Sequence, residues 1–316
     1  MKSIAVLMPV YNDWESASSL VNELNRVLIP EYTATYVLVD DGSFQEVPRI
    51  LTENPSVKIV PLVRNFGHQR AIAIGLSWIA GCNLHPDLVV VMDSDGEDDA
   101  AGLTALLKHH ETESQKIIFA SRINRKEGGL FKVSYFIYKI LFRLLTGARI
   151  SFGNFSLIPG SVLKKLVYSP EIWNHYSSGI MRSKLNYTFI PVQRGKRIAG
   201  SSKMSFVSLV LHGLSAISVY VDIVAVRLLL TFLVFSGLSV IGVLIVLYYR
   251  FFTGLAIPGW ATGAVTGLIL IFLQALLISL FLAFIALNYR SQHMIIPARE
   301  YRDYILNGNV EENDHV

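Results

Sequence analysis

The sequence has a single cysteine among its 316 residues, and it carries little charge for its length. One thiol, Cys82, cannot form a disulfide within the chain, which excludes a disulfide-stapled secreted fold and favours a reducing compartment. Charged residues make up only 16% of the chain, and the formal net charge is +4. This charge is too small to indicate nucleic acid, and we expect no nucleic acid among the partners.

Two long stretches in the C-terminal third contain no charged residue at all. They run from Leu228 to Tyr249 and from Thr262 to Leu287. Each exceeds the roughly 20 residues that a helix needs to cross the hydrocarbon core of a bilayer. With 52% hydrophobic residues overall, the chain is also too apolar for an ordinary soluble domain. We therefore predict a multi-pass membrane protein with transmembrane helices at 225–250 and 262–288.

Lysine and arginine flank the two predicted spans almost entirely on one side. The short connection at 250–261 carries only Arg250 and is rich in aromatic residues, as is typical of a membrane interface. The opposite flanks carry seven cations: Lys196, Arg197, Lys203, Arg227, Arg290, Arg299 and Arg302. The positive-inside rule then predicts that both termini are cytoplasmic, at the inner cell membrane. Anionic membrane lipids are the expected partners of these cations.

Residues 1–204 alternate short apolar runs with helical patterns. This alternation predicts an α/β domain with a mostly parallel sheet that is covered on both faces. The predicted strands lie at 4–10, 35–40, 57–63, 88–93 and 116–121, and the predicted helices lie at 14–28, 67–80 and 100–110.

Two further helices and a tail complete the predicted organisation. Residues 130–147 form a basic, aromatic helix whose composition favours the membrane surface. Residues 205–224 are predicted as a juxtamembrane amphipathic helix, for which a core position is equally consistent. Residues 289–316 form a cytoplasmic tail, and the polar composition of 303–316 predicts disorder.

The stretch VVVMDSDGEDD, residues 89–99, runs from an apolar strand into five carboxylates. Asp93 and Asp95 form a D-x-D pair, and two carboxylates so placed can hold one hard cation, Mg²⁺ or Mn²⁺. Glu97 is a candidate third ligand, whereas Asp98 and Asp99 are better placed to cap the next helix. An acidic, solvated helix start without any metal is the alternative interpretation.

Acidic residues also follow other predicted strands. Asp13 comes after the first strand and Asp40 after the second, as Asp93 and Asp95 come after the fourth. Parallel sheets bind their ligands beyond the carboxyl ends of the strands. The sequence therefore predicts a polar pocket at this edge of the sheet.

Three motifs accompany the D-x-D pair in order: MPVYND (8–13), VDDGS (39–43) and VRNFGHQRAIAIGL (63–76). Together they resemble the family 2 glycosyltransferases of GT-A fold, specifically the polyprenyl-phosphate (undecaprenyl- or dolichyl-phosphate) glycosyltransferases related to dolichol-phosphate mannose synthase. The resemblance covers nearly the whole chain, including the two predicted spans. It implies a GT-A catalytic domain at 1–204 that uses Mg²⁺ or Mn²⁺.

The resemblance also implies roles for individual residues on the nucleotide-sugar side. Asp93 and Asp95 would hold the metal that bridges the diphosphate, with Glu97 standing where the family often has glutamine. The other implied nucleotide-sugar contacts, to the base, the ribose and the pocket wall, are Pro9, Tyr11, Asn12, Asp13, Asp40, Asn65 and Gly67.

On the phosphate side, the resemblance implies a set of cations. Arg122 matches the family's basic residue near the phosphates, and Lys132 with Ser134 lies in the region that binds the lipid phosphate. The R-x-x-G-x-S-K motif, which would close over donor and acceptor phosphates, is present as Arg197, Gly200, Ser202 and Lys203. The implied catalytic residues are Asp93, Asp95, Arg122, Arg197 and Lys203.

Plainer alternatives exist for several of these residues. Asp40 and Asp41 are equally consistent with a simple capped turn, and the N-x-G segment with a strand-to-helix turn. Arg197 and Lys203 are also consistent with juxtamembrane cations that contact anionic lipid.

One triplet departs from the family pattern. Where the family often has G-D-F, this chain has Gly153, Asn154 and Phe155, and asparagine cannot serve as a general base. The departure weighs little on the chemistry, because a phosphate monoester has a second pKa of about 6 and is already mostly dianionic at neutral pH.

The expected function is inverting transfer of a sugar from a nucleotide-sugar to undecaprenyl phosphate at the cytoplasmic membrane face, for cell-envelope glycan, lipid or protein glycosylation. A UDP-sugar is favoured over a GDP-sugar, and two spans allow a homo-oligomer. A processive polysaccharide synthase is one alternative, but Gln193 and Arg194 do not continue into the Q-x-x-R-W motif of such enzymes. A catalytically inactive nucleotide-sugar-binding membrane protein is the other, with Asn154 as its only support.

Overall fold

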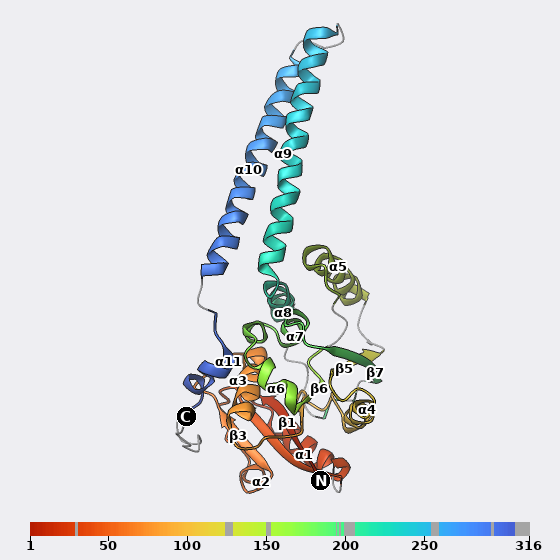
Figure 1. Ribbon diagram of the computed structural model, residues 1–316, viewed down its shortest axis with the longest axis vertical. Helices are drawn as coiled ribbons and strands as arrows, with labels where there is room; N and C mark the ends of the chain where they lie inside the picture. The colour runs from red at the N-terminus through yellow and green to blue at the C-terminus, as the bar shows by residue number, and fades with distance from the viewer. Residues whose placement is uncertain are drawn as a thin grey trace. The chain divides into compact units, whose positions relative to one another are not determined.

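The computed structural model describes residues 1–28, 31–123, 129–149, 153–193, 195, 197–198, 206–253, 259–291 and 294–306 (Figure 1). The chain divides into two compact units. The first comprises Met1–Tyr135, Ile150–Val219 and Met294–Val316, and the second comprises Phe136–Arg149 and Tyr220–His293.

The first unit is built on a seven-stranded sheet with the order β3-β2-β1-β4-β6-β5-β7. All neighbouring strands are parallel except β6, which runs antiparallel to both β4 and β5. This confirms the predicted α/β fold with a mostly parallel sheet. The strands are β1 (Lys2–Val10), β2 (Tyr32–Asp40), β3 (Val57–Pro61), β4 (Leu88–Val91), β5 (Ile117–Ile123), β6 (Ser156–Pro159) and β7 (Tyr187–Gln193).

Helices cover both faces of this sheet and enclose two hydrophobic cores (Figure 1). The helices α1 (Trp14–Leu28) and α4 (Ala100–His110) pack on one face through apolar positions three and four residues apart. The other face carries α3 (His68–Gly81), α6 (Gly160–Leu166), η1 (Pro170–Trp173) and α7 (Tyr176–Arg182). The short helix α2 (Arg49–Thr52) precedes β3.

The chain after the second long helix returns to the first unit. It forms α11 (Pro297–Glu300) and η2 (Tyr301–Tyr304), and Ile305 then makes an antiparallel bridge with Leu62 beyond the edge strand β3. The prediction of disorder from residue 303 is therefore wrong for 303–306, because this segment forms backbone hydrogen bonds with the sheet edge. Residues 307–316 lie outside the described part.

The second unit contains two helices of 32 residues, α9 (Val221–Phe252) and α10 (Trp260–Ser291). They pack along each other (Figure 1), and the most apolar windows have mean hydropathies of 2.6 and 2.9. Both are long and apolar enough to cross a membrane, and they contain the two predicted spans. The preceding helix α8 (Phe206–Ser218) ends before α9 begins, so the expected continuous helix at 205–224 is interrupted near Val219 and Tyr220.

The second unit also includes the C-terminal half of α5 (Gly129–Thr146). The Arg227 guanidinium on α9 donates hydrogen bonds to the carbonyl oxygens of Leu144 and Leu145, at 2.9 and 3.3 Å. These carbonyls lack partners in their own helix, so Arg227 caps the end of α5. The described outer face of α5 exposes Phe136, Ile137, Ile140, Leu141 and Leu144.

A glycine on α3 sets how closely this helix approaches the sheet. A Cβ atom at Gly75 would lie 2.5 Å from Leu7 Cδ1 and 2.6 Å from Val39 Cγ2. We predict that Gly75→Val destabilises the first unit by about 1–3 kcal/mol through overpacking. The same side chain at the exposed α4 position, in Ala101→Val, is the control and should cost only about 0.5 kcal/mol through helix propensity. Equal thermal stabilities of the two variants in detergent would contradict this account.

Candidate active site

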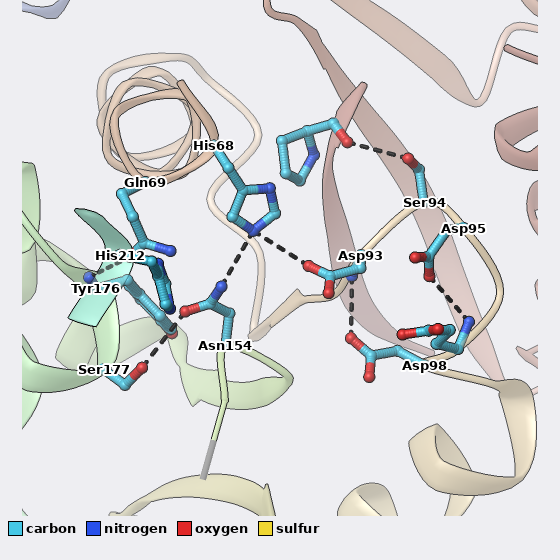
Figure 2. Close-up of polar contacts among 12 residues, drawn as sticks. His68, Gln69, Asp93, Ser94, Asp95, Asp98, Asn154, Tyr176, Ser177 and His212 are labelled. Carbon is cyan, nitrogen blue, oxygen red and sulfur yellow. Dashed lines mark hydrogen bonds and ion pairs between the residues drawn. The ribbon is translucent and has the colours of Figure 1, made fainter. Parts of the chain in front are cut away.

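The D-x-D pair lies where the order of the strands reverses. Strand β1 pairs with β2 on one side and with β4 on the other, and ligands in such sheets bind in the crevice beyond the two strand ends. The Ser94 hydroxyl donates to the carbonyl oxygen of Pro9 at 3.1 Å, which joins the turn after β4 to the end of β1. Asp93 and Asp95 therefore flank a residue that is fixed at this point, as Figure 2 shows.

The Asp93 carboxylate faces a histidine that the sequence analysis had not assigned to the site. The Nε2 atom of His68 lies 3.1 Å from Asp93 Oδ1 (Figure 2). Partial desolvation opposes protonation of His68, but the negative charge and hydrogen bond of Asp93 outweigh it and raise the pKa of the imidazole. The backbone amide of Asp93 donates to Asp98 Oδ2 at 3.1 Å.

The Asp95 carboxylate binds an arginine from the R-x-x-G-x-S-K motif. Arg197 Nη2 lies 3.4 Å from Asp95 Oδ2 and 3.9 Å from Asp13 Oδ2. The backbone amide of Ile198 donates to the Asp95 carbonyl, and that of Glu97 donates to Asp95 Oδ1 at 3.0 Å. Burial, followed by the negative charges of Asp93 and Glu97, raises the pKa of Asp95 despite the opposing charge of Arg197. The motif thus brings one cation to two of the predicted acids.

The second acid of the V-D-D-G-S motif holds the loop at 63–67. The buried Asp41 carboxylate accepts hydrogen bonds from the backbone amides of Phe66 at 2.7 Å and Gly67 at 3.0 Å. Gly42, at a φ of +72°, allows the approach, since a Cβ there would lie 2.6 Å from the amide nitrogen of Asn65. Sequence reasoning had chosen Asp40, whose carboxylate accepts from the Ser43 amide at 2.8 Å within its own turn.

The turn after β1 is tied to the turn after β2. Asn12 has a φ of +52°, and its Oδ1 accepts from the backbone amides of Phe44 and Gln45 at 3.1 and 3.4 Å. The exposed Tyr11 ring lies edge-on to Phe44, with 6.3 Å between the ring centroids. Asn12 therefore joins the turns after β1 and β2, and the neighbouring Tyr11 ring stays exposed.

A polar network connects the D-x-D turn with α3 and α7. His68 Nε2 lies 3.0 Å from Asn154 Nδ2, and Ser177 Oγ donates to Asn154 Oδ1 at 3.3 Å (Figure 2). The backbone amide of Tyr176 donates to Gln69 Oε1 at 2.6 Å. Sequence reasoning missed these contacts of His68 and Gln69, although both residues belong to the N-F-G-H-Q segment of the third motif.

Some predicted site residues cannot be placed. Arg122 belongs to β5, and Lys132 and Ser134 belong to α5, but their side chains lie outside the described part of the structure. Gly200, Ser202 and Lys203 lie outside it altogether. Among the described residues, no group of three histidine, cysteine or acidic side chains is arranged to hold a metal ion.

The comparison with protein families agrees with this arrangement. The description "Glycosyl transferase family 2" matches residues 5–166, slightly more than half of the chain and the part that contains all three motifs and the D-x-D pair. The chain belongs to glycosyl transferase family 2.

Curated relatives of the family match beyond this region. An uncharacterised glycosyltransferase, YkcC, of Bacillus subtilis (strain 168) is 26% identical over 270 residues, covering 82% of this chain and 80% of that protein. The undecaprenyl-phosphate 4-deoxy-4-formamido-L-arabinose transferase of Serratia proteamaculans (strain 568) is 26% identical over 223 residues. That match covers 66% of this chain and 65% of the relative, slightly less than two thirds of its length.

A solved structure shares the fold of the first unit. It is glucosyl-3-phosphoglycerate synthase from Mycobacterium tuberculosis in complex with Mn²⁺, uridine-diphosphate-glucose and phosphoglyceric acid. The TM-score is 0.51 at 15% identity, and the match covers 71% of this chain and 80% of that chain. At this identity the likeness concerns the GT-A fold alone.

A histidine pair lies next to the site, with His175 buried and His212 half-buried. His175 Nε2 lies 3.3 Å from His212 Nε2, and His175 Nδ1 accepts from the Ser178 amide as the N-cap of α7. Burial, followed by the nearby charges of His212 and His68, lowers the pKa of His175 to about 3. The pKa of His212 is lowered too, chiefly by burial.

We predict that the first unit loses stability as the pH falls below the ordinary histidine pKa of 6.5 towards 3, because the unfolded chain binds the proton more readily. His175→Asn keeps an N-cap acceptor but cannot titrate. Its melting temperature in detergent should therefore fall less steeply than that of the wild type between about pH 7 and about pH 5. Parallel curves for the two proteins would exclude His175 as a source of the acid sensitivity.

Proposed function

We propose that this glycosyltransferase moves a sugar from a nucleotide-sugar, with UDP favoured over GDP, to a polyprenyl phosphate, with undecaprenyl phosphate favoured. The observation that carries the proposal is the pairing of Asp93 and Asp95 with His68 and Arg197 at the strand crevice, in a chain with two helices able to span a membrane. The name of the Serratia relative supports the acceptor.

The Asp93 and Asp95 pair offers ligands for a hard divalent cation. Asp93 and Asp95 supply carboxylate oxygens, the ligands that Mg²⁺ and Mn²⁺ prefer. Burial, followed by the negative charge of Asp93, raises the pKa of Asp95, and a bound cation would favour the charged carboxylate. Asp93, Asp95 and Glu97 would hold the ion, and diphosphate oxygens would complete its shell. When bound, the ion stabilises negative charge on the leaving diphosphate.

The chain's own cations act on the same charge. Arg197 lies between Asp13 and Asp95, and it can therefore bind a diphosphate oxygen without leaving the acidic turn. His68 holds the other carboxylate through Asp93 Oδ1. Fixed donors of this kind stabilise a developing charge because they need no reorganisation during the reaction. We assign Arg122, Ser202 and Lys203 to the donor and acceptor phosphates on the basis of their motifs.

The acceptor needs no strong base. A lipid phosphate is mostly dianionic at neutral pH and can attack the anomeric carbon directly, so the C–O bond to the nucleoside diphosphate breaks as the new C–O bond forms. The described neighbours of Asn154 are His68 and Ser177, and the amide orients their polar atoms without accepting a proton. A single displacement of this kind inverts the configuration at the anomeric carbon.

The chain topology supports a membrane site on one side of the bilayer. The first unit includes both α8, before the two long helices, and residues 294–306, after them. The two long helices therefore leave and re-enter the same unit along the chain, which supports a hairpin with both ends on one side of the membrane. The excess of lysine and arginine on these flanks supports the cytoplasmic side.

We expect membranes containing this protein to transfer label from a nucleotide-sugar into a lipid extract, in a panel of UDP- and GDP-sugars with added undecaprenyl phosphate. EDTA should abolish the transfer, and Mn²⁺ or Mg²⁺ should restore it, because the carboxylates alone repel the diphosphate. A nucleotide-sugar-binding protein without catalysis would give no lipid product from any donor, and a processive synthase would give polymer.

Asp95→Asn should lower the transfer rate at least about 100-fold, a loss comparable with removing one group that stabilises transition-state charge. Its carboxylate contacts Arg197 and lies in the predicted metal site. The matched control is Asp87→Asn, because Asp87 binds Ser3 at the opposite end of β1 and should not affect transfer. Wild-type activity in Asp95→Asn, with both variants inserted in the membrane, would remove the metal assignment.

A further inference from the structure

The segment that follows the second long helix pairs with the chain at the end of the edge strand β3. We call residues 294–306 the C-terminal strap. The Val63 amide donates to the Tyr304 carbonyl at 3.0 Å, and the Leu306 amide donates to the Pro61 carbonyl at 2.9 Å. Edge strands such as β3 expose unpaired backbone groups, and the strap satisfies part of this edge just before the 63–67 loop begins.

Two further contacts fix the strap on the first unit. Tyr301 is buried in the core beneath α3, where a Cβ atom at Gly81 would collide with the Tyr301 hydroxyl. The Ala298 amide donates to the Val167 carbonyl at 3.0 Å, beyond the end of α6. The strap is thus held by backbone hydrogen bonds at two places and by Tyr301, which packs against Gly81. It is part of the fold of the first unit.

The last aromatic residue of the strap packs on the 63–67 loop. The Tyr304 ring lies edge-on to Phe66 with 5.1 Å between centroids, and it lies 4.8 Å from the Trp173 ring of η1. The Arg64 guanidinium stacks over the Phe66 ring, 4.5 Å from its centroid. Phe66 is also the residue whose amide binds Asp41. The loop is therefore held at Phe66 in two ways: Asp41 binds its backbone amide, and Tyr304 packs on its ring.

We infer that Tyr304 is a positioning residue for the nucleotide-sugar, acting through Phe66 on the loop that carries Asn65 and Gly67 and leads into His68. This inference rests on the proposed function, which assigns that loop to the donor. It also means that residues 1–204 do not contain the whole donor site. The site is completed only after the chain has passed through the helical hairpin and returned to β3.

The test uses the full-length protein in detergent and compares Tyr304→Ala, Tyr304→Phe and the control Tyr168→Ala, which removes an exposed tyrosine from the same unit. The first measurement needs no activity: hydrogen exchange of the peptide that contains the Phe66 and Gly67 amides. We expect faster exchange in Tyr304→Ala, and wild-type exchange in Tyr304→Phe, which keeps the ring, and in the control.

The second measurement is the KM for the nucleotide-sugar. Because an aromatic pair contributes about 0.5–1.5 kcal/mol, loss of the Tyr304–Phe66 pair should raise the donor KM roughly twofold to tenfold. The KM for the lipid acceptor should not change. Tyr304→Phe should keep the wild-type donor KM.

Unchanged exchange in Tyr304→Ala would overturn the inference whatever the enzyme does. Faster exchange with an unchanged donor KM would also overturn it, since the strap would then serve stability alone. If the wild type makes no product, the proposed function fails, and the exchange result alone decides whether Tyr304 positions the loop.

Discussion

The site depends on one buried carboxylate, that of Asp41 at the end of β2. Its two hydrogen bonds from the Phe66 and Gly67 amides bring the loop after β3 against the loop after β2. Burial raises the pKa of Asp41, and the two amides oppose this by stabilising the charged form. From this point the chain extends in two directions: Phe66 reaches the aromatic ring of Tyr304, and the first residue of α3, His68, reaches Asp93. Loss of the Asp41 carboxylate would therefore disturb both the D-x-D turn and the packing of the C-terminal strap.

The sequence predicted the elements whose residues follow a regular pattern. The first five strands show as short apolar runs, the helices α1, α3 and α4 as helical patterns, and the two long helices as uncharged apolar stretches, and Asp99 caps α4 as expected. Strand β6 has four residues, too few to show a period, and β7 alternates half-buried with exposed positions. Residues 303–306 were predicted to be disordered because the polar composition of 303–316 hides Tyr304 and Ile305, which pack on distant residues of the first unit. Tertiary contacts of this kind leave no local signal.

In the candidate site too, residues in motifs could be predicted, and residues fixed by tertiary contacts could not. The D-x-D turn and Arg197 are recognisable as motifs, and the structure brings them together at 3.4 Å. The roles of His68 and of Asn154 depend on a contact between α3 and the segment before β6, which are 86 residues apart. A lone histidine has no spacing that identifies such a partner. The choice of Asp40 over Asp41 failed to anticipate the loop anchor for a similar reason, since burial alone distinguishes the two carboxylates.

The arrangement of charges explains why Asn154 is compatible with catalysis. In the proposed reaction a dianionic acceptor meets a diphosphate donor, so the dominant obstacle is repulsion between anions rather than removal of a proton. An aspartate at position 154 would add a third carboxylate beside His68, which already faces Asp93 at 3.1 Å. Asparagine keeps the hydrogen bonds to His68 and Ser177 without that charge. Asparagine at this position therefore adds no negative charge to a site whose proposed substrates are themselves anionic.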